Sequence, residues 1–183
     1  QTEAAYIDLL SLDMELQTAT PPTNFTQRLK ELNTRLERQG LNTAILETTL
    51  LQLKFEAFFT PTDSCIEMLF EWTHAQLNAG LNSLATQGLL ALVRALVKIG
   101  DLTPFENVLT FIGVNVATRD NLELEWSERV LKAMSLTQSR NFEATEPVWG
   151  QAKAAHQRLV EKLPSGSQHA FFKVEPRQSL LRH

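Results

Sequence analysis

Cysteine, glycine and proline are scarce in this chain, with one, seven and seven residues among 183. The lone Cys65 excludes an internal disulfide and any metal site built from several cysteines. Most of the glycines and prolines fall between segments of helical periodicity, which is typical of an all-helical chain. A chain without disulfides suits a reducing compartment, so we expect a cytoplasmic location, with the periplasm as the open alternative.

Long apolar runs and basic clusters are missing as well. No run approaches the ~20 residues that cross a bilayer, so we expect no membrane insertion. The formal net charge is −4. No basic stripe of the kind that neutralises phosphates is present, so we expect no direct contact with nucleic acid. The chain opens on Gln1 rather than on Met, which suggests processing or a piece of a longer protein.

The sequence also lacks the motifs of catalysis and metal binding. Its four histidines form no pair at the i, i+4 spacing of a helical metal site, and no His-Glu-x-x-His run occurs. There is no glycine-rich phosphate loop, dinucleotide fingerprint or Gly-x-Ser-x-Gly turn. We therefore expect a protein that is not an enzyme and that uses no cofactor or metal.

What the chain does contain is a period of forty residues, repeated four times. Self-similarity at 20–50 residues is typical of stacked-repeat proteins. Apolar residues recur at the same place in each unit, in three columns: Leu10, Leu50, Leu90 and Val130; Phe25, Cys65, Phe105 and Thr145; Leu29, Leu69, Leu109 and Trp149. A fold that repeats in this way leads us to expect binding rather than chemistry.

Apolar spacing and turn residues predict eight helices, over residues 3–18, 24–39, 43–59, 64–77, 84–99, 104–116, 122–139 and 145–163. Short turns join them in pairs, so the fold class is all-α, an α-solenoid of four stacked antiparallel hairpins. This repeat domain covers residues 1–164. Residues 165–183 are predicted to form a flexible or capping C-terminal tail.

The residues of the last unit resemble a tetratricopeptide repeat. The segment 140–144, Arg-Asn-Phe-Glu-Ala, is followed by Trp149 and Ala152, as at the turn and second helix of that family. Gly100-Asp101-Leu102 with Leu109 and Ile112 is similar, and 59–72 more weakly so. The first-helix signature is absent, and the period is forty instead of thirty-four. The resemblance implies a helical-hairpin scaffold, similar to degenerate repeats of bacterial regulators and secretion scaffolds.

One column carries charge where the others are apolar. It holds Lys54, Arg94 and Met134. Two cations at equivalent places on neighbouring helices would lie roughly 10 Å apart, and an Arg forks well onto a carboxylate. The column therefore predicts a clamp for a carboxylate of a bound peptide. The open alternative is that both cations are solvated surface charges.

A second candidate is the apolar tail segment that contains Phe171 and Phe172. It could cover the end of the last hairpin, since an uncapped solenoid end exposes apolar surface, or it could dock on a neighbouring molecule. Two residues that suggest chemistry are expected to pack instead. Cys65 and His156 each occupy an apolar column, so we predict a buried thiol and a packed imidazole.

These features predict a non-enzymatic protein–protein interaction module: a scaffold, a chaperone or a regulatory domain. Its concave helical surface would take a peptide or helix of a partner protein. The alternative is a ligand-sensing regulatory domain of a larger bacterial transcriptional regulator. A homodimer through the solenoid end or the tail is also compatible with the sequence.

Overall fold

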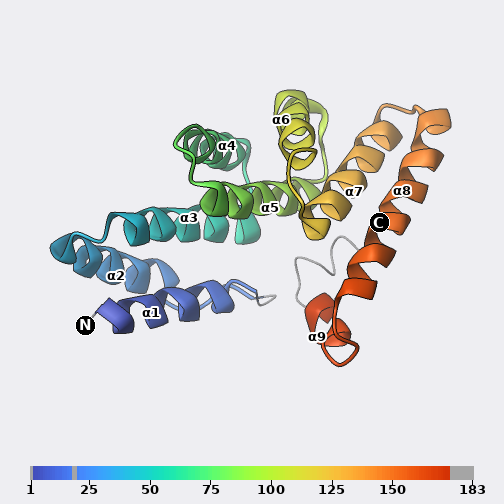
Figure 1. Cartoon of the computed structure of the whole chain (residues 1–183). Coiled ribbons are helices and arrows are strands. Elements are labelled where there is room, and N and C mark those ends of the chain that lie inside the picture. Colours follow the sequence, from blue (N-terminus) through green and yellow to red (C-terminus); the bar gives the residue numbers. More distant parts are fainter. Residues whose placement is uncertain (1, 18–19, 174–183) are drawn as a thin grey trace. The chain divides into compact units, whose positions relative to one another are not determined.

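The computed structural model describes residues 2–17 and 20–173, and it confirms an all-α chain. Those residues contain no strand. They form nine α-helices and one short 3₁₀ turn (Figure 1): α1 Thr2–Glu15, α2 Phe25–Gln39, α3 Asn42–Phe59, α4 Asp63–Asn78, α5 Asn82–Ile99, η1 Thr103–Phe105, α6 Glu106–Val116, α7 Leu122–Gln138, α8 Phe142–Lys162 and α9 Gln168–Lys173.

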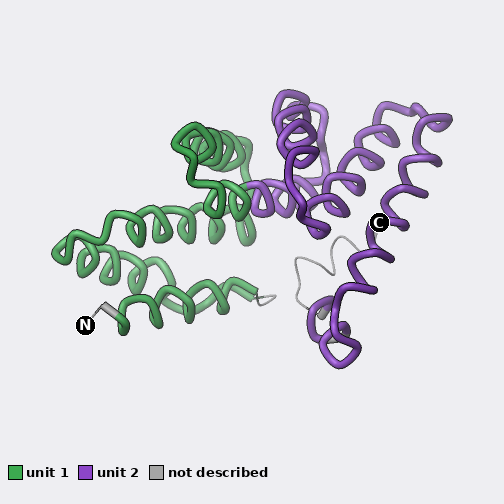
Figure 2. Tube along the Cα trace, in the orientation of Figure 1, with its two compact units in different colours: residues 1–88 green, residues 89–183 purple. Residues whose placement is uncertain are grey.

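The chain divides into two compact units, residues 1–88 and 89–183 (Figure 2). The division falls inside α5, which is a continuous helix from Asn82 to Ile99. Half of the residues of α5 are buried apolar side chains (Leu84, Ala85, Leu89, Ala91, Leu92, Val93, Ala95, Leu96 and Val97). A helix that is apolar on all sides belongs in an interior. The predicted boundary between residues 164 and 165 stays a prediction.

In the first unit, consecutive helices pack against each other. α2 contacts both α1 and α3, α3 contacts α4, and α1 also reaches α3. The helix α2 has four buried apolar residues at i, i+4, i+7 and i+11, as the spacing predicts: Phe25, Leu29, Leu32 and Leu36. The ring of Phe25 stacks on Phe55 of α3, with centroids 4.8 Å apart. This face holds α2 and α3 together through apolar burial.

In the second unit, α7 packs along α8 and also contacts α6. Trp126, Val130 and Leu131 of α7 are buried, as are Ala155 and Leu159 of α8. The interface is therefore made of apolar faces at helical spacing, which is how antiparallel helices joined by a short turn bury their surface.

Three of the turns share one backbone geometry. Gly40, Gly80 and Arg140 each take a left-handed conformation, with φ of 67°, 72° and 56°. In each turn the next residue donates its N–H to the carbonyl five residues back, for example Leu41 to Leu36 (3.1 Å) and Asn141 to Leu136 (2.9 Å). This is the Schellman motif, in which glycine is preferred because it has no Cβ. Arg140 adopts the same strained conformation without that advantage.

The C-terminal part differs from the predicted helices. The last long helix begins at Phe142, three residues earlier than predicted, so Pro147 lies inside it. Proline removes the N–H that would bond the carbonyl of Glu143. Both residues are exposed, so water can reach that carbonyl. A further helix, α9, forms within the segment predicted to be a tail.

Gly88 is the point of closest approach between α4 and the first half of α5. A Cβ added at Gly88 would lie 2.3 Å from the Oγ1 and 3.1 Å from the Cβ of Thr73. Thr73 is fully buried, and its hydroxyl donates to the carbonyl of Leu69 (2.7 Å). Any larger residue at position 88 must therefore push the two helices apart.

We expect Gly88→Ala to lower the free energy of unfolding by about 1–3 kcal/mol, because overpacking outweighs the gain in helix propensity. Gly150→Ala is the matched control. Gly150 lies in α8 with open space around its Cα, so alanine there should stabilise by roughly 0.5–1 kcal/mol. Urea unfolding followed by circular dichroism measures both. Thr73→Ala should relieve part of the Gly88→Ala loss; equal losses in both Thr73 backgrounds would contradict the predicted contact.

Candidate interaction surface

The helix α1 has apolar side chains on two opposite faces. Its inner face holds buried residues: Ala5, Leu9, Leu12 and Leu16 just beyond the helix end. Its outer face carries Ile7, Leu10 and Met14, which are 65%, 66% and 72% exposed, and Tyr6 at 40%. Single exposed apolar residues are ordinary, but a contiguous group marks a surface that another molecule covers.

Residues Ile7, Leu10 and Met14 follow the 3–4 spacing that aligns side chains along one side of a helix. This spacing is also that of the seam between two packed helices, where each apolar side chain inserts between side chains of the neighbour. The residues Ile7, Leu10 and Met14, together with Tyr6, are called the α1 stripe below. A shallow, almost wholly apolar hollow of about 500 Å³ lies over Ile7, Leu10 and Met14.

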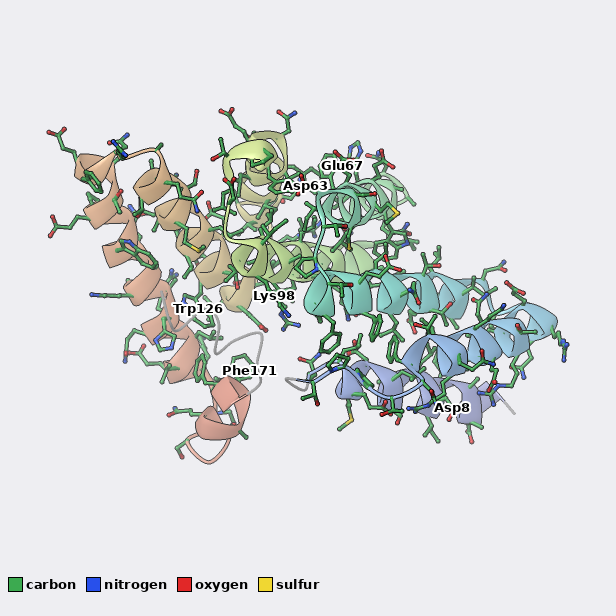
Figure 3. All side chains as sticks on the ribbon, turned by 180° about the vertical axis from the view of Figure 1, so that it is seen from behind. Asp8, Asp63, Glu67, Lys98, Trp126 and Phe171 are labelled. Carbon is green, nitrogen blue, oxygen red and sulfur yellow. The ribbon has the colours of Figure 1, made fainter. Side chains whose placement is uncertain are left out.

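Carboxylates border the α1 stripe, and α1 contains no Lys or Arg. Asp8, labelled in Figure 3, pairs with Arg35 of α2 at 2.5 Å. Glu15 receives two hydrogen bonds of 2.8 Å from the guanidinium of Arg28, a bidentate arrangement. These pairs are exposed, so they orient α1 on α2 and contribute little stability.

Lys54 of α3 lies beside Asp13, on the side of α1 opposite to Asp8 and Glu15. Its ammonium is paired with Asp13 at 2.8 Å, and it donates to the side chain of Gln87 at 3.3 Å. Its side chain is only 7% exposed. The alternative of a solvated surface charge is therefore wrong for Lys54. The sequence could not show this, because the ion pair joins residues 41 positions apart.

The remaining members of that column are buried too. Arg94 has a side chain 10% exposed and lies 3.4 Å from Glu123, in the second unit. Met134 is buried at 8%. Both predicted cations thus have a carboxylate of their own unit within reach. The peptide clamp stays a prediction, and these pairs compete with it.

Phe171 and Phe172 belong to α9 and are half-buried. Phe172 meets Trp126 of α7 edge-on, with centroids 5.8 Å apart, and His156 of α8 at 4.9 Å. Phe171 lies against Phe172 at 5.1 Å; Trp126 and Phe171 are labelled in Figure 3. The apolar tail segment therefore folds onto the last helix pair of its own chain. Such edge-to-face contacts add ~1 kcal/mol to apolar burial.

The residues that suggested chemistry are packed. Burial raises the pKa of the Cys65 thiol to about 11, with a smaller contribution from the charge of Glu56, so little reactive thiolate forms near neutral pH. The His156 ring touches Trp126 at 5.1 Å, and burial lowers its pKa. Both packing predictions are confirmed. Among the described residues, no three His, Cys, Asp or Glu side chains gather as metal ligands would.

Two further grooves lie between neighbouring helices. One, of about 580 Å³, runs between α1 and α2 and is lined by charged residues that include Asp8, Arg35 and Arg38. The other, of about 400 Å³, lies between α6 and α7 and is more apolar. Glu128 lines it, and burial raises the pKa of this carboxyl above its usual range. Neither groove contains a residue that the sequence singled out as a site.

Sequence reasoning missed the α1 stripe. A signal for it existed, because Leu10 belongs to the column of Leu50 and Val130, and Met14 to the column of Lys54 and Met134. The columns show that these positions share a face with residues that are buried elsewhere, but they do not show that this face of α1 is exposed. Only the exposed fractions reveal that difference.

Comparison of the chain with models of known protein families, with curated proteins and with solved structures finds no match. The tetratricopeptide resemblance therefore stays a prediction that depends on the residues quoted for it. Within the described helices, none combines the length and apolarity that crossing a bilayer requires.

The burial of Lys54 predicts different outcomes for two substitutions. Lys54→Glu should lower the free energy of unfolding by about 3–5 kcal/mol, because a carboxylate would lie beside Asp13 without a cation. Lys54→Met should cost less, about 1–2 kcal/mol, because it leaves Asp13 without its cation but water can hydrate that carboxylate, which is 38% exposed. Urea unfolding checks both. A Lys54→Glu protein as stable as wild type would contradict the buried pair.

His156 makes stability depend on pH. Because its folded pKa is lowered, the unfolded chain takes up the proton first as pH falls below about 6.5. Stability present at pH 7 is therefore lost progressively below that value. We expect His156→Phe to lose less stability than wild type between pH 7 and pH 5. Comparing the two proteins cancels the other titrating groups; identical pH profiles would contradict the prediction.

Proposed function

We propose that this protein is a helical interaction module that binds an α-helix of a partner protein on the α1 stripe. The observation that carries the proposal is the exposure of Ile7, Leu10 and Met14 at 65–72%, at the 3–4 spacing of a helix–helix seam. Binding a helix in this way is a known mode of peptide recognition, in which anchors at i, i+3 and i+7 enter an apolar surface.

We further propose that the helices are repeats of one hairpin. Three features support this. The helices α3, α5 and α7 begin at Asn42, Asn82 and Leu122, forty residues apart. The turns at Gly40 and Gly80 share φ and hydrogen bonding. Lys54 of α3 also donates a hydrogen bond to Gln87 of α5, and Arg94 of α5 donates one to Glu123 of α7. In both cases a cation of the same column bonds to the helix that begins forty residues later.

The repeat explains why the stripe should take a helix. Leu50 and Lys54 of α3 correspond to Leu10 and Met14, and they are 1% and 6% exposed. Lys54 is covered from the side of α1, as its pair with Asp13 shows. The equivalent face of α1 is open. A partner helix that lies on α1 as α1 lies on α3 would bury the α1 stripe with the packing already used within the chain.

We expect a display library of 20-residue helical peptides, selected on the immobilised protein, to yield binders with apolar residues at 3–4 spacing. Substituting Ile7, Leu10 and Met14 together by serine should weaken those binders at least tenfold. The three side chains supply most of the apolar area, and a loss of 1.4 kcal/mol is already tenfold. Fluorescence anisotropy with labelled peptides measures the dissociation constants.

Val114→Ser and Phe142→Ser serve as controls, since these residues are also exposed apolar side chains, 63% and 64%, but lie on α6 and α8. Neither should change the affinity, and circular dichroism should show all variants equally helical. Binders that tolerate the triple serine variant but not the control variants would place the interaction elsewhere and refute the proposal.

A further inference from the structure

All the charged side chains that α1 itself contributes beside the α1 stripe are negative. Its four ionisable residues are all acids: Glu3, Asp8, Asp13 and Glu15. Glu3, Ile7, Leu10 and Met14 fall in one row at spacings of four, three and four, so Glu3 extends the stripe towards the start of the helix. Glu3 is exposed.

The border beside Asp13 carries more negative than positive charge. Lys54 faces Asp13 at 2.8 Å, and it also interacts with the carboxyl of Glu47 on α3. Burial raises the pKa of Glu47, the charge of Lys54 lowers it, and the charge of Asp13 raises it further. The charge of Lys54 therefore acts on the carboxyls of both Asp13 and Glu47. The side chain of Asp13 is 38% exposed, so a second cation can approach it from outside.

The opposite border is close to neutral. Asp8 and Glu15 are matched there by Arg35 and Arg28. Summed around the stripe, the excess is negative and lies at Glu3 and at the Asp13–Glu47 side. Charged groups at the rim of an apolar contact select partners of complementary charge and repel like charge.

A second copy of this chain fits that rim poorly. In an antiparallel pair of identical helices related by a two-fold axis, each border meets itself. The Asp13 borders of the two copies would then lie side by side, and both carry the same excess charge.

We infer that the occupant of the α1 stripe is a basic amphipathic helix of another protein. This inference rests on the proposed function and adds the chemistry of the partner. Apolar side chains at 3–4 spacing would cover Ile7, Leu10 and Met14. Lys or Arg residues beside them would meet Glu3 at one end of the stripe and Asp13 with Glu47 along its border.

Two labelled 21-residue peptides test the inference. Both carry Leu at the same 3–4 spacing and the same helix-forming background; the first has Lys at the positions beside the Leu stripe and the second has Glu there. Anisotropy is measured at nanomolar peptide, so the peptides do not pair with each other. We expect the Lys peptide to bind at least tenfold more tightly at 50 mM salt, with a difference that shrinks at 500 mM as charges are screened.

Variants locate the contact. Leu10→Ser should weaken the Lys peptide at least tenfold, whereas Val114→Ser should leave its affinity unchanged. Glu3→Lys should weaken the Lys peptide about three- to fivefold and strengthen the Glu peptide, because it reverses the charge at the end of the stripe and leaves the apolar side chains in place.

The outcomes separate the two claims. If both peptides bind equally well and Leu10→Ser abolishes the binding, the inference of a basic partner is wrong, whereas helix binding on the α1 stripe is retained. Failure of both peptides, or binding that Leu10→Ser does not weaken, would overturn helix binding as well. A dimer seen by light scattering in wild type, but not in Leu10→Ser, would assign the stripe to a second copy and overturn the inference.

Discussion

Helices with apolar side chains on opposite faces need a neighbour on each side, and this requirement governs the whole chain. In α3 and α7, the residues that correspond to Leu10 and Met14 of α1 are buried: Leu50, Lys54, Val130 and Met134. Such a helix is covered only when other helices pack on both of its sides, as α1, α2 and α4 contact α3. The same requirement, unmet at α1, creates the surface that we propose to be functional.

At a few positions, the packing of the helices depends on a residue that is charged, small or aromatic. Lys54 is buried, and Asp13 and Gln87 satisfy its ammonium. Gly88 lets α5 approach Thr73 of α4. In the second unit, Trp126, His156 and Phe172 bring α7, α8 and α9 together. A charged or bulky residue is tolerated where a partner from another helix meets it.

Much of the helical architecture was predictable, because helix formation depends on local spacing and on turn residues. The prediction of a helix beginning near residue 43 and one beginning at 122 came from apolar periodicity, and the structure places these starts at Asn42 and Leu122. Gly40 and Gly80 marked two Schellman turns. The start of α8 was misjudged because Pro147 suggested a helix start, whereas the Asn141 side chain accepts a hydrogen bond from Ala144 and caps the helix earlier.

By itself the sequence determined the all-α class, the places of the turns and the packing of Cys65 and His156, since these follow from patterns within about one helical hairpin. Only the tertiary structure decided which members of each column are covered by another helix. Lys54 and Met14 occupy one column, yet one is buried against Asp13 and the other is 72% exposed. Spacing along the chain records which residues share a face. Exposure depends on which distant helix lies over that face.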